Sequence, residues 1–291
     1  MRSLILKSPA KLNLFLRITG RRPDGYHNLL TLFHRISLAD TLRLTKTAED
    51  FSLTCGDSRV PTDERNLITK AYRLLQARFP ALAGVRVDLK KRIPIGAGLG
   101  GGSSNAAAFL LGMKKLCRLP VSNAGLLKLG ARLGADVPFF IHEINQGVGV
   151  GRGDLIREIK SGSGHFFILA ASRKGSSTKE VYENFAGKGR PASLTKSRRE
   201  LRILCNFLAE KKYEKAAVFL KNDLEFSAFE LRPSLRNLIE KFKKRGVLFA
   251  GMTGSGPTVF GISSGLREAK RAVKALRKEL PSNQILSCRS F

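Results

Sequence analysis

Apolar and polar residues alternate along several short stretches of the chain, and longer stretches between them have helical spacing. The alternation is clear at residues 12–16 and again at 85–89, while an apolar run occupies residues 106–116. A period of two is typical of a half-buried strand, whereas the longer apolar run suits a buried helix. The pattern therefore predicts a chain that mixes strands with helices.

The same patterns, with capping and turn residues, predict most of the remaining elements. Strands are expected within 29–53, near 155–159, at 165–171 and 284–288, and as a strand, turn and strand across 247–261. Helices are expected from 63–66 to about 75, at 122–133, from Ser177 or Thr178 onward, over most of 196–245, and at 266–280. A glycine-rich turn is expected at 147–153.

The length of the chain favours two lobes over one. At 291 residues it can bury one large core or two moderate ones, and two are more usual at this size. The run Ser161-Gly162-Ser163-Gly164 has the composition of a linker. We therefore expect an N-terminal domain of residues 1–160 and a C-terminal domain of residues 161–291.

The charge of the chain opens a possible function in nucleic-acid binding. Its formal net charge is +29, which favours contact with phosphates. The basic residues, however, are spread over the predicted helices at 196–221, 241–245 and 267–278, and no RNA-recognition or zinc-finger pattern occurs. A surface that attracts small anionic substrates, or that keeps the protein in solution, explains the charge equally well.

Cysteine spacing and hydropathy favour a cytosolic protein. The four cysteines, Cys55, Cys117, Cys205 and Cys288, lack the paired spacing of a metal site or a disulfide framework. No run of about eighteen apolar residues occurs, and residues 1–14 do not resemble a secretory leader. We expect reduced thiols and a cytoplasmic location.

A glycine-rich stretch from Pro94 to Ala107 lies between a predicted strand and a predicted helix. Five glycines occupy the seven positions 96–102. Main-chain N–H groups at such a helix start bind anions, and glycine lets phosphate oxygens approach the backbone. Ser103, Ser104 and Asn105 add side-chain donors and candidate magnesium ligands. Because the stretch runs directly into an apolar helix, a phosphate-binding loop is favoured over a flexible linker.

This loop matches neither of the two common phosphate-binding patterns. It has no lysine, which excludes a Walker loop. Its Gly-x-Gly-x-x-Gly spacing matches a dinucleotide fold, but no Asp or Glu occurs from Gly101 to Ala135 to bind a ribose. The sequence predicts a phosphate site of another kind.

Several polar residues lie at positions that allow either a structural or a chemical role. Lys11 and Asn13 share one face of a predicted strand, where a lysine is expected to face solvent. Tyr26 and His27 follow a Pro-Asp-Gly turn and could stack on a base or cover the core. Asp136 precedes a turn led by Pro138, and local sequence alone favours a helix-capping role for it.

Three stretches, residues 9–14, 94–107 and 252–260, resemble in this order the signature motifs of the GHMP small-molecule kinases, the family of galactokinase, homoserine kinase and mevalonate kinase. The resemblance implies an α+β fold of two lobes, the N-terminal one like ribosomal S5 domain 2 and the C-terminal one ferredoxin-like. It also implies ATP and Mg²⁺ as cofactors. The implied ATP-binding residues are Pro94, Gly96, Gly98, Leu99, Gly100, Gly101, Gly102, Ser103 and Ser104.

Three further segments, residues 20–27, 134–140 and 151–154, resemble those of GHMP kinases whose alcohol substrate carries a cytidine diphosphate. This likeness implies that Asp136 is the catalytic base and Lys11 its partner, with Tyr26, His27 and Tyr182 at the cytosine. Phe185 lies close enough in sequence to compete with Tyr182 for the second stacking position. The implied substrate-binding residues are Asn13, Tyr26, His27, Asp136, Thr178 and Tyr182.

The chain departs from the family pattern at two places. Residues 142–145 replace a glycine pair, and Asp154 stands where glutamate is usual, so both departures concern local loop geometry. A kinase acting on another alcohol, such as mevalonate or homoserine, and a basic nucleic-acid-binding protein are the alternatives. We expect a monomer or weak homodimer with a small-molecule substrate, and neither a membrane nor a nucleic-acid partner.

Overall fold

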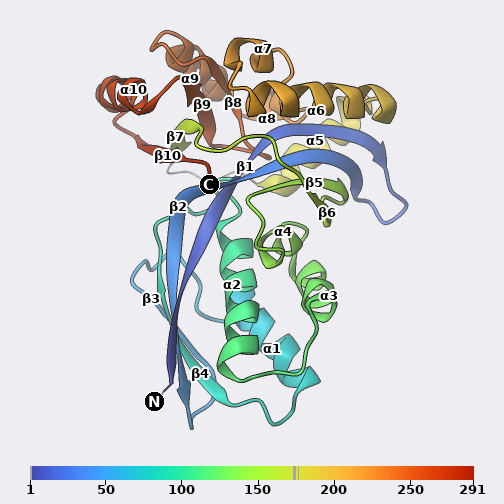
Figure 1. Cartoon of the computed structure of the whole chain (residues 1–291), viewed down its shortest axis with the longest axis vertical. Coiled ribbons are helices and arrows are strands. Elements are labelled where there is room, and N and C mark those ends of the chain that lie inside the picture. The colour runs from blue at the N-terminus through green and yellow to red at the C-terminus, as the bar shows by residue number, and fades with distance from the viewer. Residues whose placement is uncertain (1, 173–174, 176) are drawn as a thin grey trace. The chain divides into compact units, whose positions relative to one another are not determined.

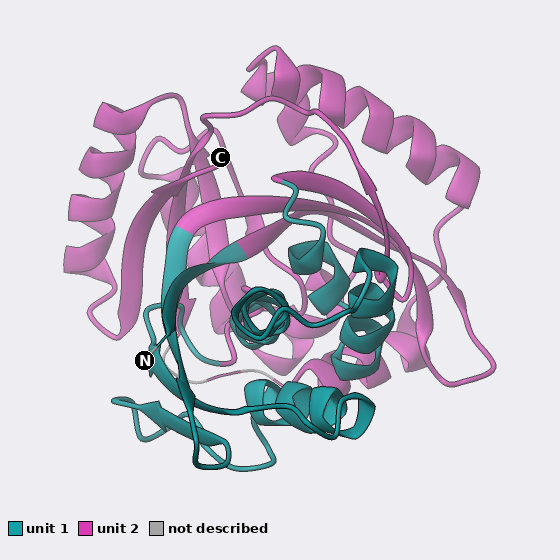
Figure 2. Cartoon of the chain, turned by 60° about the horizontal axis from the view of Figure 1, so that its bottom comes forward, with its two compact units in different colours: residues 1–10, 38–95, 100–144 teal, residues 11–37, 96–99, 145–291 magenta. Residues whose placement is uncertain are grey.

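The computed structural model describes residues 2–172, 175 and 177–291. These residues form two compact units, coloured separately in Figure 2. Unit 1 comprises the described residues within 1–10, 38–95 and 100–144, and unit 2 comprises those within 11–37, 96–99 and 145–291. Strands β1 (Ser3–Arg21) and β2 (His27–Thr47) contribute residues to both. The domain boundary expected at residues 160 and 161 stays a prediction.

Unit 1 packs helices against one face of a small sheet (Figure 1). Strand β4 (Gly84–Lys90) pairs antiparallel with residues 41–47 of β2 and parallel with β3 (Ser52–Cys55). The helices are α1 (Leu67–Arg78), α2 (Gly101–Leu116), α3 (Asn123–Leu133) and α4 (Val137–Ile141). A Cβ added to Gly112 of α2 would lie 2.5 Å from the side chains of Leu6 and Leu44, so this helix rests directly on the strands.

Two helices of unit 1, α1 and α3, begin at side-chain caps. The Asn66 side chain accepts a hydrogen bond from the Ile68 amide at the start of α1. Ser122 caps α3 in the same way through the Gly125 amide, and α3 ends at Gly134. An N-cap oxygen satisfies an amide that has no partner within the helix. The sequence predictions for both helices are confirmed.

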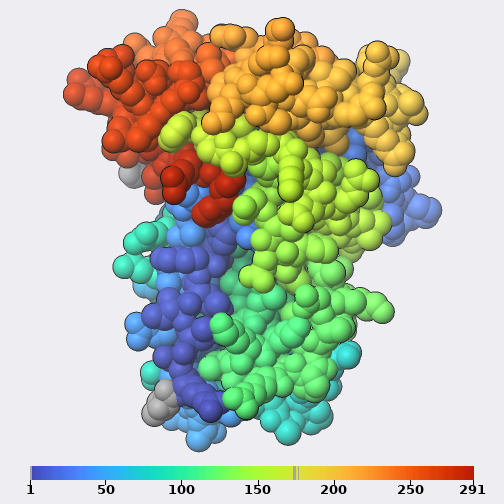
Figure 3. All heavy atoms as spheres, in the orientation of Figure 1, coloured from blue at the N-terminus to red at the C-terminus, as the bar shows by residue number. Residues whose placement is uncertain are grey.

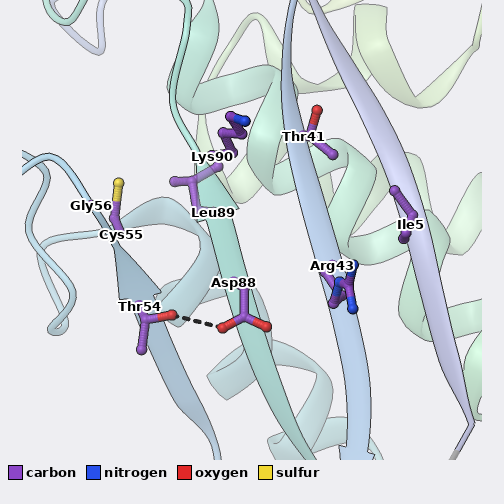
Figure 4. Close-up of a pocket in the computed structure, with 9 residues that line it drawn as sticks. All are labelled: Ile5, Thr41, Arg43, Thr54, Cys55, Gly56, Asp88, Leu89 and Lys90. Carbon is purple, nitrogen blue, oxygen red and sulfur yellow. Dashed lines mark hydrogen bonds between the residues drawn. The ribbon is translucent and has the colours of Figure 1, made fainter.

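The opposite face of the unit 1 strands is open. Polar, charged and apolar residues there line a hollow of about 510 Å³ (Figure 4). Within it Asp88 accepts a hydrogen bond of 2.9 Å from the Thr54 hydroxyl. Its lining residues are Ile5, Thr41, Arg43, Thr54, Cys55, Gly56, Asp88, Leu89 and Lys90.

Unit 2 contains a four-stranded antiparallel sheet in the order β10-β7-β9-β8. Its strands are β7 (Phe166–Ser172), β8 (Phe249–Met252), β9 (Val259–Ser263) and β10 (Asn283–Arg289). Helix α5 (Thr178–Lys188) follows β7, and α10 (Leu266–Glu279) joins β9 to β10. This order is that of a ferredoxin-like sheet, as expected for the C-terminal lobe.

Four further helices lie in the chain between α5 and β8. They are α6 (Leu194–Ala209), α7 (Tyr213–Ala217), α8 (Glu225–Leu231) and α9 (Ser234–Lys243). The apolar side of α9, including Leu238 and Phe242, joins Ile168 of β7 and Leu276 of α10 in one buried cluster. Burial of this apolar surface is the main term that stabilises the unit.

The turn expected at residues 147–153 is shorter than the sequence indicated. Residues 146–151 form strand β5 (Gln146–Gly151), which pairs antiparallel with residues 29–34 of β2 and with β6 (Leu155–Glu158). A Cβ on Gly149 would lie 2.8 Å from the Phe33 ring and 2.9 Å from the Gly153 oxygen. Glycine there permits close strand packing instead of forming a turn, so this part of the prediction was wrong.

None of the helices in the described part of the chain has the length and apolar character needed to span a bilayer. The four cysteines are free thiols in this structure. Burial raises the pKa of the Cys205 thiol to about 11 and raises that of Cys288 further.

Candidate active site

Lys11 and Asn13 lie on β1 in unit 2 with only 4% of their surface exposed. The Lys11 ammonium donates a 2.6 Å hydrogen bond to Asn13 Oδ1 and lies 5.5 Å from the centre of the Phe33 ring. Asn13 Nδ2 donates to the Thr31 hydroxyl at 2.8 Å. The expectation that Lys11 faces solvent was wrong, because both faces of β1 are covered at this point. A buried ammonium of this kind needs fixed acceptors.

The turn between β8 and β9 lies against this pair. The Asn13 amide donates a 2.8 Å hydrogen bond to Thr253 Oγ1. A Cβ on Gly254 would lie 3.3 Å from Asn13 Oδ1, 3.6 Å from Lys11 Nζ and 3.5 Å from the Gly98 oxygen. The first and third predicted motifs therefore meet at the beginning of the glycine stretch.

The part of the glycine stretch that belongs to unit 2, residues 96–99, is held between those two motifs. Gly98 has a φ of +74°, and a Cβ there would lie 2.8 Å from the carbonyl oxygens of Thr253 and Gly256. The Lys11 amide donates to the Leu99 oxygen at 3.0 Å. Only glycine fits at position 98, because its conformation is left-handed and its neighbours are backbone atoms.

Thr178 reaches the same turn from the beginning of α5. Its hydroxyl lies 2.9 Å from the Ser255 hydroxyl, and Ser177, one residue earlier, caps the helix through the Glu180 amide. The structure thus brings Thr178, predicted to bind substrate, next to the third motif.

The remaining glycines form the start of α2 in unit 1. Gly100 occupies the N-cap with a φ of 69°, and no side chain caps the helix. The first helical bond runs from the Ser104 amide to the Gly100 oxygen at 2.9 Å. The amides of Gly101, Gly102 and Ser103 therefore have no acceptor within the helix. Such amides, together with the positive end of the helix dipole, suit the phosphates of a nucleotide.

Buried hydrogen bonds fix the beginning of α2 to strands β1 and β2. The Ser8 hydroxyl donates to Ser104 Oγ at 2.8 Å, and Asn105 Nδ2 donates to Ser8 Oγ at 2.8 Å and to Asp40 Oδ2 at 3.0 Å. The sequence made Asn105 a candidate magnesium ligand. In the structure its side-chain nitrogen instead joins α2 to β1 and β2 within unit 1. Among the residues that the structure describes, no group of three or more His, Cys, Asp and Glu side chains could hold a metal ion.

Asp136 occupies the N-cap position of α4 without acting as a cap. Its φ and ψ are −82° and −16°, and its side chain makes no capping hydrogen bond. The capping role favoured by local sequence was therefore wrong. A Cβ on Gly134, two residues earlier, would lie 4.0 Å from Ser103 Oγ, so the turn that carries Asp136 lies beside the first turn of α2.

Aromatic rings gather around His27 in unit 2. The centre of the His27 ring lies 5.5 Å from that of Tyr182, tilted by 31°, and 6.1 Å from that of Phe185. Burial, and secondarily the charge of Arg21, lowers the pKa of His27 below its usual value, which favours the neutral imidazole. Phe185 is buried in the core, whereas Tyr182 is only partly buried. Tyr182 is thus the better placed of the two to meet a ligand.

Tyr26 has a different environment. It is 58% exposed, and the Arg152 guanidinium carbon lies 5.4 Å from the centre of its ring. Arg152 in turn pairs with Asp154 at 2.7 Å, the residue that departs from the family pattern.

Sequence reasoning missed four residues that support the predicted ones. Thr31 and Thr253 hold Asn13 by hydrogen bonds. Asp40 bonds to Asn105 near the beginning of α2, and Lys91 bonds to Asp40. Thr31 and Thr253 sit in ordinary strand and turn patterns that single out neither. Asp40 gave one signal, an acidic residue within a predicted strand of a strongly basic chain.

The glycine stretch, the buried Lys11 and Asn13 and the ferredoxin-like sheet together define a GHMP kinase. The family model for the N-terminal domain of these kinases matches residues 66–143, and that for the C-terminal domain matches residues 193–282. Members of this class are small-molecule kinases that use ATP. The expected fold class and enzyme class are therefore confirmed.

Comparison with individual relatives identifies the family within the GHMP kinases to which the chain belongs. The chain is 35% identical to a 4-diphosphocytidyl-2-C-methyl-D-erythritol kinase of Acaryochloris marina, over 97% of this chain and 94% of the relative. It is 37% identical to the enzyme of that name from Bacillus velezensis, over 94% and 93%. A crystal structure of 4-(cytidine 5'-diphospho)-2C-methyl-D-erythritol kinase superposes with a TM-score of 0.84 and 31% identity, over 99% of both chains. The chain belongs to the 4-diphosphocytidyl-2-C-methyl-D-erythritol kinase family.

Proposed function

We propose that this protein phosphorylates the C2 hydroxyl of 4-(cytidine 5'-diphospho)-2-C-methyl-D-erythritol in non-mevalonate isoprenoid biosynthesis. The observation that carries the proposal is the aromatic group around His27, where a largely neutral imidazole lies beside the Tyr182 ring. A cytosine ring requires stacking surfaces and a hydrogen-bonding edge. Mevalonate and homoserine have no ring, so a kinase for either would not need this group.

ATP, when bound, supplies the phosphoryl group. The amides at the start of α2 that have no acceptor within the helix, and the closely packed glycine at position 98, support binding of its phosphates by the glycine stretch. The residues proposed for this role are Pro94, Gly96, Gly98, Leu99, Gly100, Gly101, Gly102, Ser103 and Ser104. Mg²⁺ is proposed as the companion of ATP, with Ser104 as a candidate contact, because magnesium in such sites is held largely by phosphates and water.

Asp136 is proposed to accept the proton of the attacking hydroxyl. Its side chain does not cap α4, which supports a chemical role over a structural one. Lys11 is proposed as its catalytic partner, and its buried, hydrogen-bonded ammonium supports a fixed position for that charge. Alignment of the acceptor and balance of the developing charge are the main requirements of phosphoryl transfer.

The rest of the substrate is assigned to unit 2 residues. Tyr26 and Tyr182 are proposed to stack on the two faces of the cytosine, and His27 to read its edge. Asn13 and Thr178 are proposed to contact the substrate near the third motif. A cytoplasmic location and a monomeric or weakly dimeric state stay predictions.

An ADP-release assay with competing acceptors tests the proposal. Turnover is expected with 4-(cytidine 5'-diphospho)-2-C-methyl-D-erythritol and not with mevalonate or homoserine. Efficient turnover of either smaller alcohol, without turnover of the cytidine compound, would assign the chain to another GHMP activity.

The cytosine site can be tested in the same assay. Tyr182→Ala is expected to raise KM for the cytidine substrate by about 5- to 150-fold, the effect of losing one stacking ring. Tyr182→Phe keeps the ring and serves as the matched control. An unchanged KM in the alanine variant would remove Tyr182 from the site.

A further inference from the structure

Asp40 is the most deeply buried carboxylate near the glycine stretch, with none of its surface exposed. It lies on β2 within unit 1, and four donors converge on it. Oδ1 accepts from the amides of Arg92 and Ile93 at 2.7 and 2.8 Å, and Oδ2 accepts from Lys91 Nζ and Asn105 Nδ2 at 2.5 and 3.0 Å. Four bonds use the main acceptor positions of an ionised carboxyl group.

These donors lie at the two ends of the glycine stretch. Residues 91–93 lead into it from β4, and Asn105 is in the first turn of α2, where the stretch ends. One carboxylate therefore holds both the entrance and the exit of the glycine-rich segment. Glycine-rich backbone loses much conformational freedom when it is ordered, so fixing its ends lowers the entropy lost on ligand binding.

Stability alone does not account for this arrangement. A buried charge is costly to desolvate even when it is well paired, and apolar residues of similar size often stabilise a core as well or better. The strand residues Leu42 and Leu44, close to Asp40 in sequence, show the apolar alternative. A buried carboxylate directed at a phosphate-binding backbone indicates a role in ligand binding.

Because of the position of Lys91, the charge of Asp40 and its hydrogen bonds to the backbone have opposite effects on anion binding. A Cβ on Gly101 would lie 2.9 Å from Lys91 Nζ, so this ammonium lies at the positive end of the α2 dipole. Removing the Asp40 charge would make this region more positive, which by itself would strengthen anion binding. Loss of the fixed backbone would weaken it.

We propose that Asp40 is a positioning residue for the nucleotide, which acts by fixing the two ends of the phosphate-binding loop. The proposal rests on the proposed function insofar as ATP binds to this loop. Geometry is expected to outweigh charge, because two of the four bonds hold the backbone of residues 92 and 93, directly before the loop.

Asp40→Asn tests the proposal, since it keeps the shape of the side chain and removes its charge. KM for ATP is expected to rise about 10- to 100-fold, the effect of one or two lost hydrogen bonds to a charged group. KM for the alcohol is expected to stay unchanged. Asp88→Asn is the matched control, because Asp88 lies on the open face of β4, where it accepts a hydrogen bond from the Thr54 hydroxyl (Figure 4). The melting temperature is measured for each variant.

A second variant removes the Asp40 bond at the exit of the loop. Asn105→Ala loses this bond together with the bond from Asn105 to Ser8, and it leaves three donors on Asp40, so a smaller rise in the KM for ATP is expected. This variant keeps the proposal testable if Asp40→Asn does not fold. An unchanged KM for ATP in the folded variants, tighter ATP binding, or an equal rise in both KM values would overturn the proposal.

Calorimetric binding of a non-hydrolysable ATP analogue separates this inference from the proposed function. If the wild-type protein binds the analogue but does not phosphorylate the cytidine substrate, the proposed function fails and the Asp40 comparison is still decisive. If the Asp40→Asn variant binds the analogue as tightly as the wild-type protein, the role of Asp40 fails, whatever the substrate.

Discussion

Lys11 and Asn13 show how single polar residues are fixed where a core would otherwise be apolar. Both are almost fully buried, and the hydrogen bonds among Lys11, Asn13, Thr31 and Thr253 give them fixed directions. Fully satisfied buried networks make a site rigid, whereas an unsatisfied member would destabilise it. A rigid cation is what a phosphoryl-transfer site requires.

Asp136→Asn is expected to lower kcat by about 10²- to 10⁴-fold, the effect of losing a general base, and no helix cap is lost because the Asp136 side chain makes no capping bond at α4. Ser122→Ala is the matched control, since Ser122 does cap its helix. It should lower the free energy of unfolding by about 0.5–2 kcal/mol and leave kcat intact. Wild-type kcat in Asp136→Asn would exclude the base.

Gly98→Ala is expected to impair ATP binding through backbone crowding alone. The new Cβ would lie 2.8 Å from two carbonyl oxygens, at a residue whose φ of +74° disfavours side chains. KM for ATP should rise at least about tenfold, a change of about 1.4 kcal/mol. Gly187→Ala, where nothing lies within 4 Å of the new Cβ, should behave as the wild type. Equal kinetics for both variants would show that the loop adapts.

At the scale of elements, the sequence predicted what local rules determine. The caps Asn66 and Ser122 act on amides two or three positions away, so their helices were identified correctly. The burial of Lys11 and the capping role of Asp136 were misjudged, because packing between distant segments decides them. Asn13 bonds to a residue 240 positions away, and the donors to Asp40 lie 51 to 65 positions away. Local periodicity carries no information about such pairs.

A buried polar cluster joins β2, the segment that leads into β7, and α7. His34 Nε2 lies 2.9 Å from the Ser161 hydroxyl, and the ring centres of His34 and His165 are 5.6 Å apart. His165 Nδ1 lies 3.0 Å from the Tyr213 hydroxyl. Burial lowers the pKa of His34 to about 3, with the charge of His165 as a second cause, and burial also lowers the pKa of His165. Both shifts favour the neutral form of the rings in the folded protein.

This cluster is expected to make the protein sensitive to mild acid. Below the ordinary histidine pKa of 6.5, His34 binds a proton in the unfolded chain. In the folded protein it remains neutral until the pH approaches its pKa of about 3. Its contribution to stability is therefore complete above pH 6.5 and is lost as pH falls toward 3, by about 1.4 kcal/mol per pH unit. Urea unfolding measured between about pH 7 and 5 should show this slope, and His34→Gln should flatten it. Parallel curves for the two proteins would contradict the assignment.

At the scale of the whole molecule, the net charge is +29, and exposed helix faces carry part of it. The outer surfaces of α6, in yellow to orange, and of α10, in red, are visible in Figure 3. The exposed basic residues of α10 are Arg267, Lys270, Arg271, Lys274, Arg277 and Lys278. Such a surface raises the local concentration of anions, and both ATP and the proposed cytidine substrate are anions.

Salt is therefore expected to lower kcat/KM more than kcat. Raising ionic strength from about 0.01 M to about 1 M shortens the Debye length from about 30 Å to about 3 Å, which removes long-range attraction but leaves buried contacts largely intact. The triple variant Lys270→Glu, Arg271→Glu, Lys274→Glu should weaken the salt dependence and leave kcat unchanged, because these side chains are exposed on α10. Tight, steeply salt-dependent binding of a nucleic-acid duplex, reduced in the same variant, would instead assign the charge to a polyanionic partner.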